Sequence, residues 1–552
     1  MSHNPSHTEL TAIYLPIDRR HALAYGLQLP RQAHGAALFA DISGFTVLTE
    51  SLKRSLGPRQ GAERLAIYLN QVYDALIAEV DRYGGSVIGF SGDAITCWFD
   101  DTFIHRVYAA CGLEQPSAQP AVLRAVTAAL AIQKAMLQFS TIEVPGQGVF
   151  PLRVKAAVAC GQVQRLLVGD PQHQLLDATA GETLLRMAAA EKQALPSQTI
   201  VDQATTAALG DQLEIEQQLV DEYGQHFSVI RGMRRPAEAI PWPALPGERL
   251  DEGQISPWLL KPVYQRLVQL QGEFLTELRP AAALFLRFSG IDFENDPACG
   301  EALDGYIRWV QTIVARYDGT FIQLTVGEKG SYLYVAFGAP RAHEDDPLRA
   351  ARAALELART PAQLAGIRQV QIGLSLGAMR TGSYGGRTRR TYGVLGDDVN
   401  LAARLMQAAA PGQILASGQL REALGPACRW QDLPPMQVKG KNEPVPVAAL
   451  LGLMDWQPVI FAGRRPLVGR KAELEQAVQA GARLSSIPPS FAGAIVLDGD
   501  AGIGKSRLAQ ELHEQLGEWQ ELRWLECPCD AILGQSLHPF KYWLRRYFNQ
   551  DS

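Results

Sequence analysis

The stretch Ala36-Ala37-Leu38-Phe39-Ala40-Asp41-Ile42-Ser43-Gly44-Phe45-Thr46 joins an apolar run to an aspartate, a turn and the start of a helical pattern. The apolar run predicts a buried strand over 36–40, and the periodicity that follows predicts a helix near 46–56. Ser43 and Gly44 supply the tight turn between the two elements. The stretch therefore predicts strand, turn and helix in that order, the opening of a mixed α/β unit.

Two features of this turn suit a phosphorylated ligand. The free backbone N–H groups of Gly44, Phe45 and Thr46 point out of a helix N-terminus, where phosphate is favoured. Asp41, at the strand end, suits the metal ion that accompanies phosphate. The same arrangement also occurs as a plain helix cap. A second carboxylate nearby would favour a phosphate and metal site over a cap without a ligand.

That second carboxylate is Asp93, which lies in Ser91-Gly92-Asp93 between two β-rich runs over 86–90 and 94–99. This composition predicts a tight hairpin. A hairpin tip beside the end of the first strand brings Asp41 and Asp93 onto one pair of hard cations. Mg²⁺ held by one or two carboxylates and by substrate phosphates is the usual chemistry of such a pair.

The first domain recurs in altered form later in the chain. Ala36-Ala37-Leu38-Phe39-x-x-x-Ser43-Gly44 returns as Ala282-Ala283-Leu284-Phe285-x-x-x-Ser289-Gly290, which indicates an internal duplication. Two copies of one α/β unit can pack as a pseudo-twofold pair with composite sites in the groove between them. Aligning the copies puts Arg287 where the first has Asp41, so the second copy has lost the metal carboxylates.

The second copy carries polar groups that the first lacks. Aligning the glycines that precede two matching helices places Leu185 opposite Asn400 and Ala189 opposite Arg404. Asn400 and Arg404 are four residues apart, so they share one face of a helix that begins after Gly396. The complementary losses predict one complete composite site and one degenerate site.

These segments resemble the class III nucleotidyl cyclases, and the order of modules is most similar to soluble adenylyl cyclases with two cyclase domains in tandem. The resemblance implies an α/β (α+β sandwich) fold, with two ferredoxin-like domains packed as a pseudo-twofold heterodimer. The matching segments are Phe39-x-Asp41-Ile42-x-Gly44-Phe45-Thr46, Phe90-x-Gly92-Asp93-Ala94, Tyr392-x-Val394-Leu395-Gly396-Asp397-Asp398-Val399-Asn400-Leu401-Ala402-Ala403-Arg404 and Val438-Lys439-Gly440.

The resemblance implies conversion of ATP to 3′,5′-cyclic AMP and pyrophosphate by in-line attack of the ribose 3′-hydroxyl. Two Mg²⁺ or Mn²⁺ ions would be held by Asp41, Asp93 and the Ile42 carbonyl. Phosphoryl transfer leaves the protein mainly positioning and charge neutralisation to supply. The expected partners are the ATP substrate and the other half of an intramolecular cyclase pair.

Three side chains of the second copy receive roles from the same resemblance. Asn400 is assigned to orienting the ribose, Arg404 to the charge growing around the α-phosphate, and Lys439 to the terminal phosphates. A planar guanidinium suits spread-out oxyanion charge, in agreement with the role of Arg404. Taken alone, an Asn and an Arg on a helix are more often a solvated face.

Base selection departs from the family pattern. Adenylyl cyclases commonly carry a Lys in the hairpin of the second copy and an Asp or Thr just before the segment that begins at Val394. The corresponding residues here are Gln323 and Gly393. Gln323 can accept from and donate to a purine edge, whereas Gly393 offers only backbone. We expect Gln323 and Val394 to contact the substrate, ATP to be favoured, and GTP to be the alternative.

The C-terminal region carries Gly499-x₄-Gly504-Lys505-Ser506 between a β-rich run over 494–498 and a helical pattern. This is the spacing of a phosphate-binding loop. Its backbone N–H groups would cradle phosphates, Lys505 would reach the terminal ones and Ser506 would hold Mg²⁺, which predicts a second nucleotide site. The segment resembles the start of a signal-transduction ATPase module.

Composition excludes several other classes. The 552 residues are 47% hydrophobic and 20% charged, as in soluble globular proteins. A formal charge of −5 offers no basic surface for nucleic acid. No membrane span or signal peptide is indicated, and scattered cysteines favour a reducing, cytoplasmic location. A non-catalytic nucleotide sensor that controls the fused ATPase remains a further alternative to the cyclase.

Shifts in composition predict the domain limits, including a helical stretch over 263–278 inside a proline-rich linker. The predicted divisions are an N-terminal arm (1–34), a first cyclase domain with the metal-binding half (35–231), a linker (232–280), a second cyclase domain with the Asn, Arg and Lys half (281–452), a short linker (453–466) and the truncated beginning of a P-loop NTPase domain (467–552).

Overall fold

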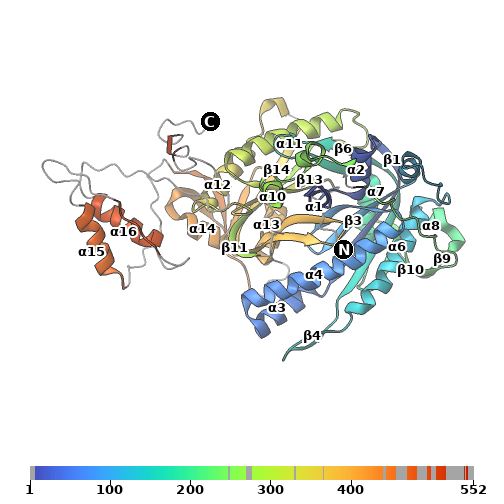
Figure 1. Cartoon of the computed structure of the whole chain (residues 1–552), viewed down its shortest axis with the longest axis horizontal. Helices are drawn as coiled ribbons and strands as arrows, with labels where there is room; N and C mark the ends of the chain where they lie inside the picture. Colours follow the sequence, from blue (N-terminus) through green and yellow to red (C-terminus); the bar gives the residue numbers. More distant parts are fainter. Residues whose placement is uncertain are drawn as a thin grey trace. The chain divides into compact units, whose positions relative to one another are not determined.

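The computed structural model separates the chain into two compact units (Figure 1). One contains residues 1–422 and 430–452, and the other contains residues 423–429 and 453–552. Both copies of the repeat lie in the first unit, apart from residues 423–429 and 453 of the second copy. The residues described are 7–246, 249–268, 277–327, 331–364, 366–438, 443–454, 469–481, 494–498, 505–517, 540, 543 and 544.

The first copy is built on an eight-stranded sheet in which β1 lies between β3 and β6. Neighbouring strands pair antiparallel except for β6 and β8, which are parallel. The order is β2 (Ser86–Ser91), β3 (Ala94–Asp100), β1 (Gln32–Ser43), β6 (Arg153–Val168), β8 (Thr199–Asp202), β10 (His226–Met233) and β9 (Leu213–Val220), with β7 (Leu176–Ala180) paired to β6 and a separate hairpin of β4 (Ile142–Val144) and β5 (Gly148–Phe150).

Alternate side chains of β1 enter two different cores, because successive residues of a strand face opposite sides of the sheet. Leu38 and Ile42 pack in the cluster that contains α4 and α6, whereas Ala37 packs with Met187 of α7. The first copy is therefore covered by helices on both faces. Its helices are α3 (Phe45–Leu56), α4 (Pro58–Arg82), α5 (Phe103–Ala110), α6 (Ala121–Ala135), α7 (Glu182–Gln193) and α8 (Gln203–Leu209).

Within the described residues, one helical segment, Ala121–Phe139, is long and apolar enough to cross a membrane by length and composition. Half of it is buried inside the protein. Its residues Ala125, Ala128 and Ile132 belong to the core that contains β1 and α4. The segment therefore serves as a core helix of the first copy.

The second copy repeats this sheet strand for strand. The mixed α/β fold with two similar sheet and helix domains is thereby confirmed. Its strands are β12 (Thr320–Thr325), β13 (Ser331–Phe337), β11 (Glu277–Ser289), β14 (Arg368–Gly385), β16 (Ile414–Ser417), β18 (Val447–Leu453) and β17 (Cys428–Asp432), with β15 (Arg390–Leu395) paired to β14, and its helices are α11 (Cys299–Arg316), α12 (Asp346–Leu357), α13 (Asp397–Ala408) and α14 (Gly418–Leu424).

The two copies differ after their central strand. In the first copy β1 leads through Gly44 directly into α3. In the second copy β11 is followed by residues 290–298, all of which are described and none of which is helical. The helix N-terminus that the sequence predicts for phosphate is therefore present in the first copy alone.

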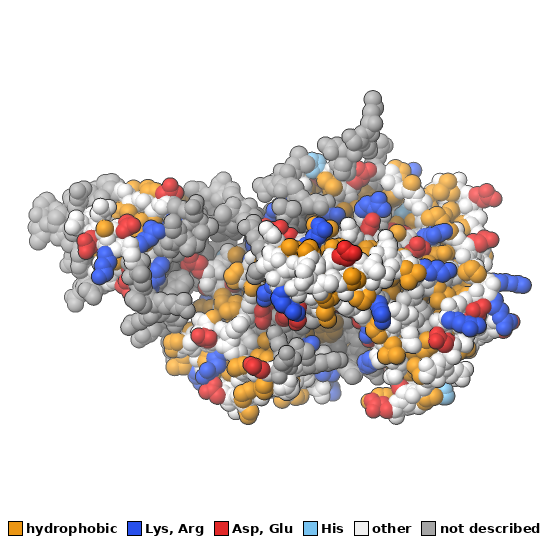
Figure 2. Space-filling model, turned by 90° about the horizontal axis from the view of Figure 1, so that it is seen from below, with side chains coloured by type: hydrophobic (Ala, Val, Ile, Leu, Met, Phe, Trp, Pro, Cys, Tyr) orange, Lys and Arg blue, Asp and Glu red, His pale blue; other side chains and the backbone are white. Residues whose placement is uncertain are grey.

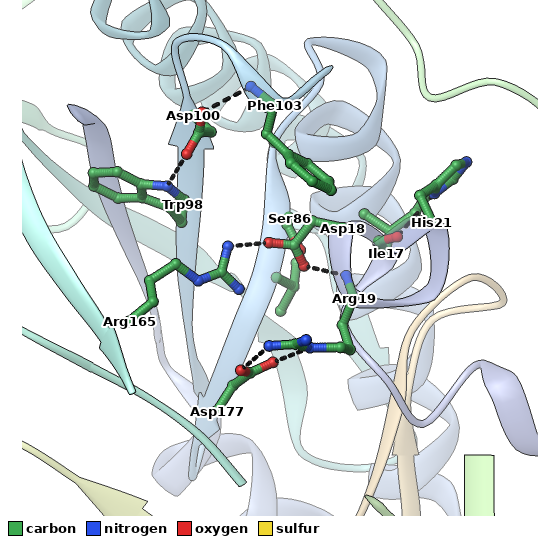
Figure 3. A network of polar contacts seen from close by, with 12 residues as sticks. Ile17, Asp18, Arg19, His21, Ser86, Trp98, Asp100, Phe103, Arg165 and Asp177 are labelled. Atoms are coloured by element: carbon green, nitrogen blue, oxygen red, sulfur yellow. Dashed lines mark hydrogen bonds and ion pairs between the residues drawn. The ribbon is translucent and has the colours of Figure 1, made fainter. Parts of the chain in front are cut away.

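The start of the chain forms two helices, α1 (His7–Ala12) and α2 (Ile17–Ala24). Figure 3 shows how α2 is fixed: Asp18 accepts hydrogen bonds from Arg165 at 2.5 Å and from the Ser86 hydroxyl at 2.8 Å, and Arg19 pairs with Asp177. These partners lie on strands of the first copy. The described part of the predicted N-terminal arm thus contains two packed helices, and residues 32–34 already belong to β1.

The same arm also contacts the second copy. The Tyr14 hydroxyl forms a hydrogen bond of 2.5 Å with Ser383 Oγ of β14, and the Arg390 backbone N–H donates to the Ile13 carbonyl at 2.7 Å. Ala12 and Leu15 pack in the core that contains second-copy strands. Residues 7–25 therefore bridge both copies.

The prediction of a helix over 263–278 is wrong at its C-terminal end. The helix that forms, α10, spans Lys261–Val268, and Leu278 already belongs to β11, paired with Arg380. Pairing of the run 277–289 along β14 competes with local helical periodicity and prevails over it. The rest of the linker contains α9 (Glu252–Ile255) and a short 3₁₀ turn, η4 (Ser256–Trp258).

Helix α4 joins the first copy to the end of β14 in the second. Asn70 Oδ1 accepts a hydrogen bond from the Gly385 N–H at 3.1 Å. The Asp74 carboxylate accepts from the Arg387 backbone N–H at 2.8 Å and from its guanidinium Nε at 2.9 Å. The two copies are thus paired within one chain at this contact.

The pseudo-twofold counterpart of that contact is made by α11. Asp304 Oδ1 accepts from the Gly169 N–H at 2.7 Å, and Gln311 Oε1 accepts from the Asp170 N–H at 2.8 Å. In both places a helix of one copy satisfies backbone donors just past the long strand of the other. This repetition is what a duplicated unit packed about a pseudo-twofold axis produces.

Charged side chains of both signs are interspersed over the described part of the face shown in Figure 2, without segregation by sign. The formal net charge is −5. This face of the described residues resembles an ordinary solvated surface and lacks the concentrated basic character of a nucleic-acid interface.

In the second unit, α15 (Lys471–Gly481) packs on α16 (Lys505–Gly517) through Leu474, Ala477, Leu508 and Leu512. The predicted strand over 494–498 is not formed, because these residues have no regular structure. Gly499 and Gly504 lie outside the described residues, so the predicted phosphate-binding loop is outside them too.

Candidate active site

The two predicted metal carboxylates lie side by side at one end of the first sheet. Asp41 lies two residues before the end of β1 and is paired in register with Ala94, the residue after Asp93. The Ile42 backbone N–H donates to the Asp93 carbonyl at 3.4 Å. The strand pairing therefore places both carboxylates and the Ile42 peptide in one small region, as the sequence predicts.

Lys155 holds Asp41 from the neighbouring strand. Asp41 is paired in register with Lys155 of β6, whose Nζ lies 3.2 Å from Asp41 Oδ2 and also pairs with Glu191 of α7. The ammonium group contributes a compensating positive charge to a cluster of three carboxylates. The sequence motifs do not include Lys155, because its relation to Asp41 depends on strand register.

The charge balance of this cluster favours a cation. Burial and, to a smaller extent, the neighbouring Asp41 raise the pKa of Asp93 to about 6. Burial also raises the pKa of Asp41, against the opposing effect of Lys155. In the described residues, no group of three or more His, Cys, Asp or Glu side chains forms a metal site. Two carboxylates and a carbonyl, completed by phosphate oxygens and water, fit Mg²⁺ or Mn²⁺.

The turn after Asp41 requires glycine. Gly44 has φ of +104°, and a Cβ there would lie 2.7 Å from the Pro151 carbonyl oxygen. The Leu48 N–H makes the first backbone hydrogen bond of α3, to the Gly44 carbonyl at 3.1 Å. The backbone N–H groups of Phe45 and Thr46 precede that bond, so they stand at a helix N-terminus beside the carboxylates.

Asn400 and Arg404 both lie on α13, as the sequence predicts, after Gly396 with φ of +150°. Asn400 is exposed and Arg404 is half-buried. Among the described residues, neither side chain forms a hydrogen bond or ion pair with Asp41 or Asp93. Lys439, the third group with an assigned phosphate role, lies outside the described residues.

Gln323 connects the two copies at the hairpin that carries Asp93. Its Nε2 donates to Ser91 Oγ of the first copy at 2.9 Å and to Thr325 Oγ1 at 3.0 Å. Val394 is buried, and its carbonyl accepts a hydrogen bond from the Tyr334 hydroxyl at 3.2 Å. Of the two residues expected to contact the substrate, Gln323 therefore lies at the contact between the copies, whereas Val394 is packed inside the second copy.

Tyr384 fills the space beside Gly393. A Cβ at Gly393 would lie 2.3 Å from the Tyr384 ring. That ring also packs against Tyr73 and Phe90 of the first copy, with centroids 5.8 and 5.6 Å away. The absence of a side chain at position 393 is thus matched by a bulky neighbour on β14.

Arg380 is a further residue that the sequence motifs do not indicate. It interacts electrostatically with Asp93, Tyr73 and Tyr384, while burial lowers the pKa of its guanidinium. Its Nη1 atom is buried without a hydrogen-bond partner among the described residues. No local signal marks Arg380, because the direction of its side chain depends on the pairing of β14 and β15.

The strand registers support the alignment that makes the second site degenerate. Asp41 faces Lys155 across the first sheet, and Arg287 faces Gln371 at the matching place in the second. Leu185 and Ala189 lie on α7, the counterpart of α13. The Glu294 carboxylate accepts from the Glu182 N–H, at the start of α7, at 2.7 Å. A protein carboxylate thus caps this helix in the degenerate half.

The second predicted nucleotide site is described only in part. Lys505 begins α16, and the backbone of Ser506 belongs to its first turn. Gly499 and Gly504 fall outside the described residues. The phosphate-binding loop therefore stays a prediction.

Comparison with known proteins shows that the chain is similar to nucleotidyl cyclases. Residues 291–448 match the family described as adenylate and guanylate cyclase catalytic domain. The chain is 23% identical over 517 residues to adenylate cyclase type 10 of Rattus norvegicus, and the match covers 87% of this chain and 30% of that protein. The chain thus spans about a third of the length of the curated relatives that it matches.

Solved structures of nucleotidyl cyclases are also similar to parts of the chain. The adenylyl cyclase CyaB from P. aeruginosa is 22% identical, with a TM-score of 0.30, covering 33% of this chain and 97% of its own. A class III adenylyl cyclase-like ATP-binding protein from Pseudomonas aeruginosa is 11% identical, with a TM-score of 0.46, covering 71% and 87%. The chain is thus similar to cyclase catalytic domains over residues 291–448 and to adenylate cyclase type 10 over most of its length.

Proposed function

We propose that this homologue of the class III nucleotidyl cyclases is an adenylate cyclase, which converts ATP to 3′,5′-cyclic AMP and pyrophosphate. The observation that carries the proposal is the carboxylate pair of Asp41 and Asp93 beside the N-terminus of α3. It is built in the first copy only and lies at a hairpin that Gln323 of the second copy contacts. The 23% identity to adenylate cyclase type 10 supports the choice of ATP.

Asp41, Asp93 and the Ile42 carbonyl would hold the metal ions. When bound, Mg²⁺ or Mn²⁺ would neutralise triphosphate charge and lower the pKa of the ribose 3′-hydroxyl. The backbone N–H groups of Phe45 and Thr46 would bind phosphate oxygens at the start of α3. These groups gather the negative charge of the substrate at one end of the first sheet.

The second copy would supply the groups that act on the reacting atoms. The bond between the ribose O3′ and the α-phosphorus forms, the bond to the β-phosphate bridging oxygen breaks, and the hydroxyl proton leaves to solvent. Asn400 would orient the ribose, Arg404 would neutralise charge on the α-phosphate, and Lys439 would bind the leaving pyrophosphate. Positioning and charge neutralisation are the main contributions of a protein to phosphoryl transfer.

We place the two cyclase domains at 35–231 and 281–452 and a P-loop module within 467–552. Lys505 and Ser506 would serve a second nucleotide there. The proposed setting is cytoplasmic signalling, with cyclic AMP as the output. These limits rest on the sequence pattern and on the matching order of strands in the two sheets.

The test is an assay of purified protein with ATP and GTP in parallel, each with Mg²⁺ or Mn²⁺. We expect equal amounts of cyclic AMP and pyrophosphate from ATP, and no product from Asp93→Asn. A preference for GTP would show that the protein is a guanylate cyclase and not an adenylate cyclase. Nucleotide binding without a cyclic product under any condition would identify a sensor and overturn the proposal.

A further inference from the structure

The base-binding region of the proposed cyclase has an unusual arrangement of side chains on one face of the strands β14 and β15. Gly382 of β14 lies directly opposite Gly393 of β15. Because alternate residues of a strand share a face, Arg380 and Tyr384 face the same side as Gly393. The packing of the Tyr384 ring over Gly393 agrees with this assignment.

Arg380 brings hydrogen-bond donors to that face. Its Nη1 atom is buried and has no partner among the described residues. A guanidinium has only donors, and a buried donor left unpaired costs about 1–3 kcal/mol. Its burial among Tyr73, Tyr384 and Asp93 makes the same atom inaccessible to bulk water. The arrangement is that of a group whose acceptor arrives with a ligand.

Gln323 brings an acceptor to the same region. Strand β12, which carries Gln323, packs against β15. Both hydrogen bonds of Gln323 to described residues are donated by its Nε2, to Ser91 and Thr325. These bonds fix the amide so that its Oε1 has no hydrogen bond from the described part of the chain. The contact between the copies thus presents one acceptor and one donor.

We infer that Arg380 is a specificity-determining residue that donates a hydrogen bond to a ring nitrogen of the substrate base, while Gln323 Oε1 accepts from the exocyclic amine. The inference rests on the proposed function and names how ATP is selected. Adenine presents an amine next to an acceptor nitrogen on both of its polar edges, N1 on one and N7 on the other. Arg380 would take the donor role for which the family pattern has Lys at position 323, and Tyr384 would close the space at Gly393.

The experiment compares ATP with 1-deaza-ATP and 7-deaza-ATP, each lacking one acceptor nitrogen, in wild type, Arg380→Met and Arg380→Lys. In wild type we expect one deaza analogue to lose about 10- to 100-fold in kcat/KM, the range for a hydrogen bond to a charged group. Arg380→Met should lose the same factor on ATP and treat ATP and that analogue alike. Arg380→Lys, which keeps a donor, should retain part of the discrimination.

The matched control is Arg368→Met, which changes an exposed arginine on the same strand and should behave as wild type. If Arg380→Met discriminates between ATP and both analogues as wild type does, the inference is overturned. An equal loss on all three nucleotides would show binding to phosphate or a structural role and would also overturn it. If wild type makes no cyclic product, the proposed function fails, and equilibrium binding of the same three nucleotides still decides the role of Arg380.

Discussion

At the scale of single residues, Asp93 has the environment that matters most for chemistry. Burial and the nearby Asp41 raise its pKa to about 6. A carboxyl group whose pKa is higher in the folded state than in the unfolded state holds its proton more tightly when folded. The free energy of unfolding therefore falls as the pH rises from about 4 to about 6, and stays lower above that range.

The first prediction follows from this sign. Asp93→Asn should raise the free energy of unfolding of the metal-free protein at pH 8 by about 1–3 kcal/mol, because it removes a buried charge whose pKa is shifted by about two units. The gain should fade as the pH falls below about 6. Urea unfolding over a pH series measures it, and Asp211→Asn, on the surface, is the control.

The same variant also tests metal binding. Mg²⁺ or Mn²⁺ should stabilise wild type against urea and leave Asp93→Asn almost unaffected, since one of two carboxylate ligands is gone. For wild type, the apparent metal affinity should drop as the pH falls through about 6, because the metal competes with a proton at Asp93. Equal stabilisation of both proteins by the metal would contradict the metal assignment.

The second prediction concerns Arg404. Arg404→Ala should lower kcat about 100- to 1,000-fold, the usual cost of removing one donor that stabilises transition-state charge. The midpoint of thermal unfolding should stay near that of wild type, because the side chain is half-buried and forms no hydrogen bond or ion pair with the described residues. Gln407→Ala, an exposed change on the same helix, is the control. Near-normal turnover in Arg404→Ala would refute the role.

At the scale of secondary-structure elements, α2 is anchored by charge. Asp18 and Arg165 are both buried and form a pair at 2.5 Å. Burial is the largest single effect and opposes the ionisation of Asp18, but Arg165, the Ser86 hydroxyl and Arg19 together outweigh it, so the pKa of Asp18 is lowered. The stabilisation from this group is therefore present above the unfolded-state pKa and is lost as the pH falls through the lower folded-state pKa.

The third prediction is a large loss of stability in Asp18→Ala. Removing one partner leaves the buried charge of Arg165 uncompensated, which costs about 3–5 kcal/mol. Urea unfolding at pH 7 measures this change. Glu50→Ala breaks an exposed pair with Arg54 on α3 and should change the free energy of unfolding by less than about 1 kcal/mol. Similar effects for the two variants would contradict the anchoring role of α2.

The elements differ in how far sequence could predict them. The strand over 36–40 and the helix after it were predicted because an apolar run, a required glycine and a helical period agree with one another. The helix over 263–278 was predicted from periodicity alone. Residues 277 and 278 instead belong to β11, because they pair with β14. The fixed position of α2 depends on Arg165 and Asp177, which are more than 140 residues away in the chain, so no local signal could supply it.

At the scale of the whole described repeat, the two copies pair within one chain through α4 and α11. The fourth prediction uses this pairing. Chains of Asp93→Asn mixed with chains of Arg404→Ala should show no recovery of activity. Each chain lacks one group of its own composite site and cannot obtain that group from another chain. Specific activity of wild type should also be independent of protein concentration. Recovered activity in the mixture would show that copies pair between chains.

The residues of the candidate site that lie in short sequence motifs could be predicted from the sequence. Asp41 and Asp93 stand in short patterns whose strand and hairpin context follows from local sequence. Arg380 and Tyr384 were missed because their common face with Gly393 exists only once β14 and β15 are in register. Lys155 was missed for the same reason, because it lies beside Asp41 only when the neighbouring strands β1 and β6 are in register.

Under the proposed function, each chain would hold one reaction centre, because the described residues 290–298 of the second copy form no helix that matches α3. A chain with one reaction centre yields one turnover cycle at a time, so titration with a tight inhibitor should reach its end point at one equivalent per polypeptide. No cooperativity can arise between equal centres inside such a monomer. A sigmoidal response to ATP would therefore require communication from a different location, either elsewhere on the polypeptide or from an associated molecule.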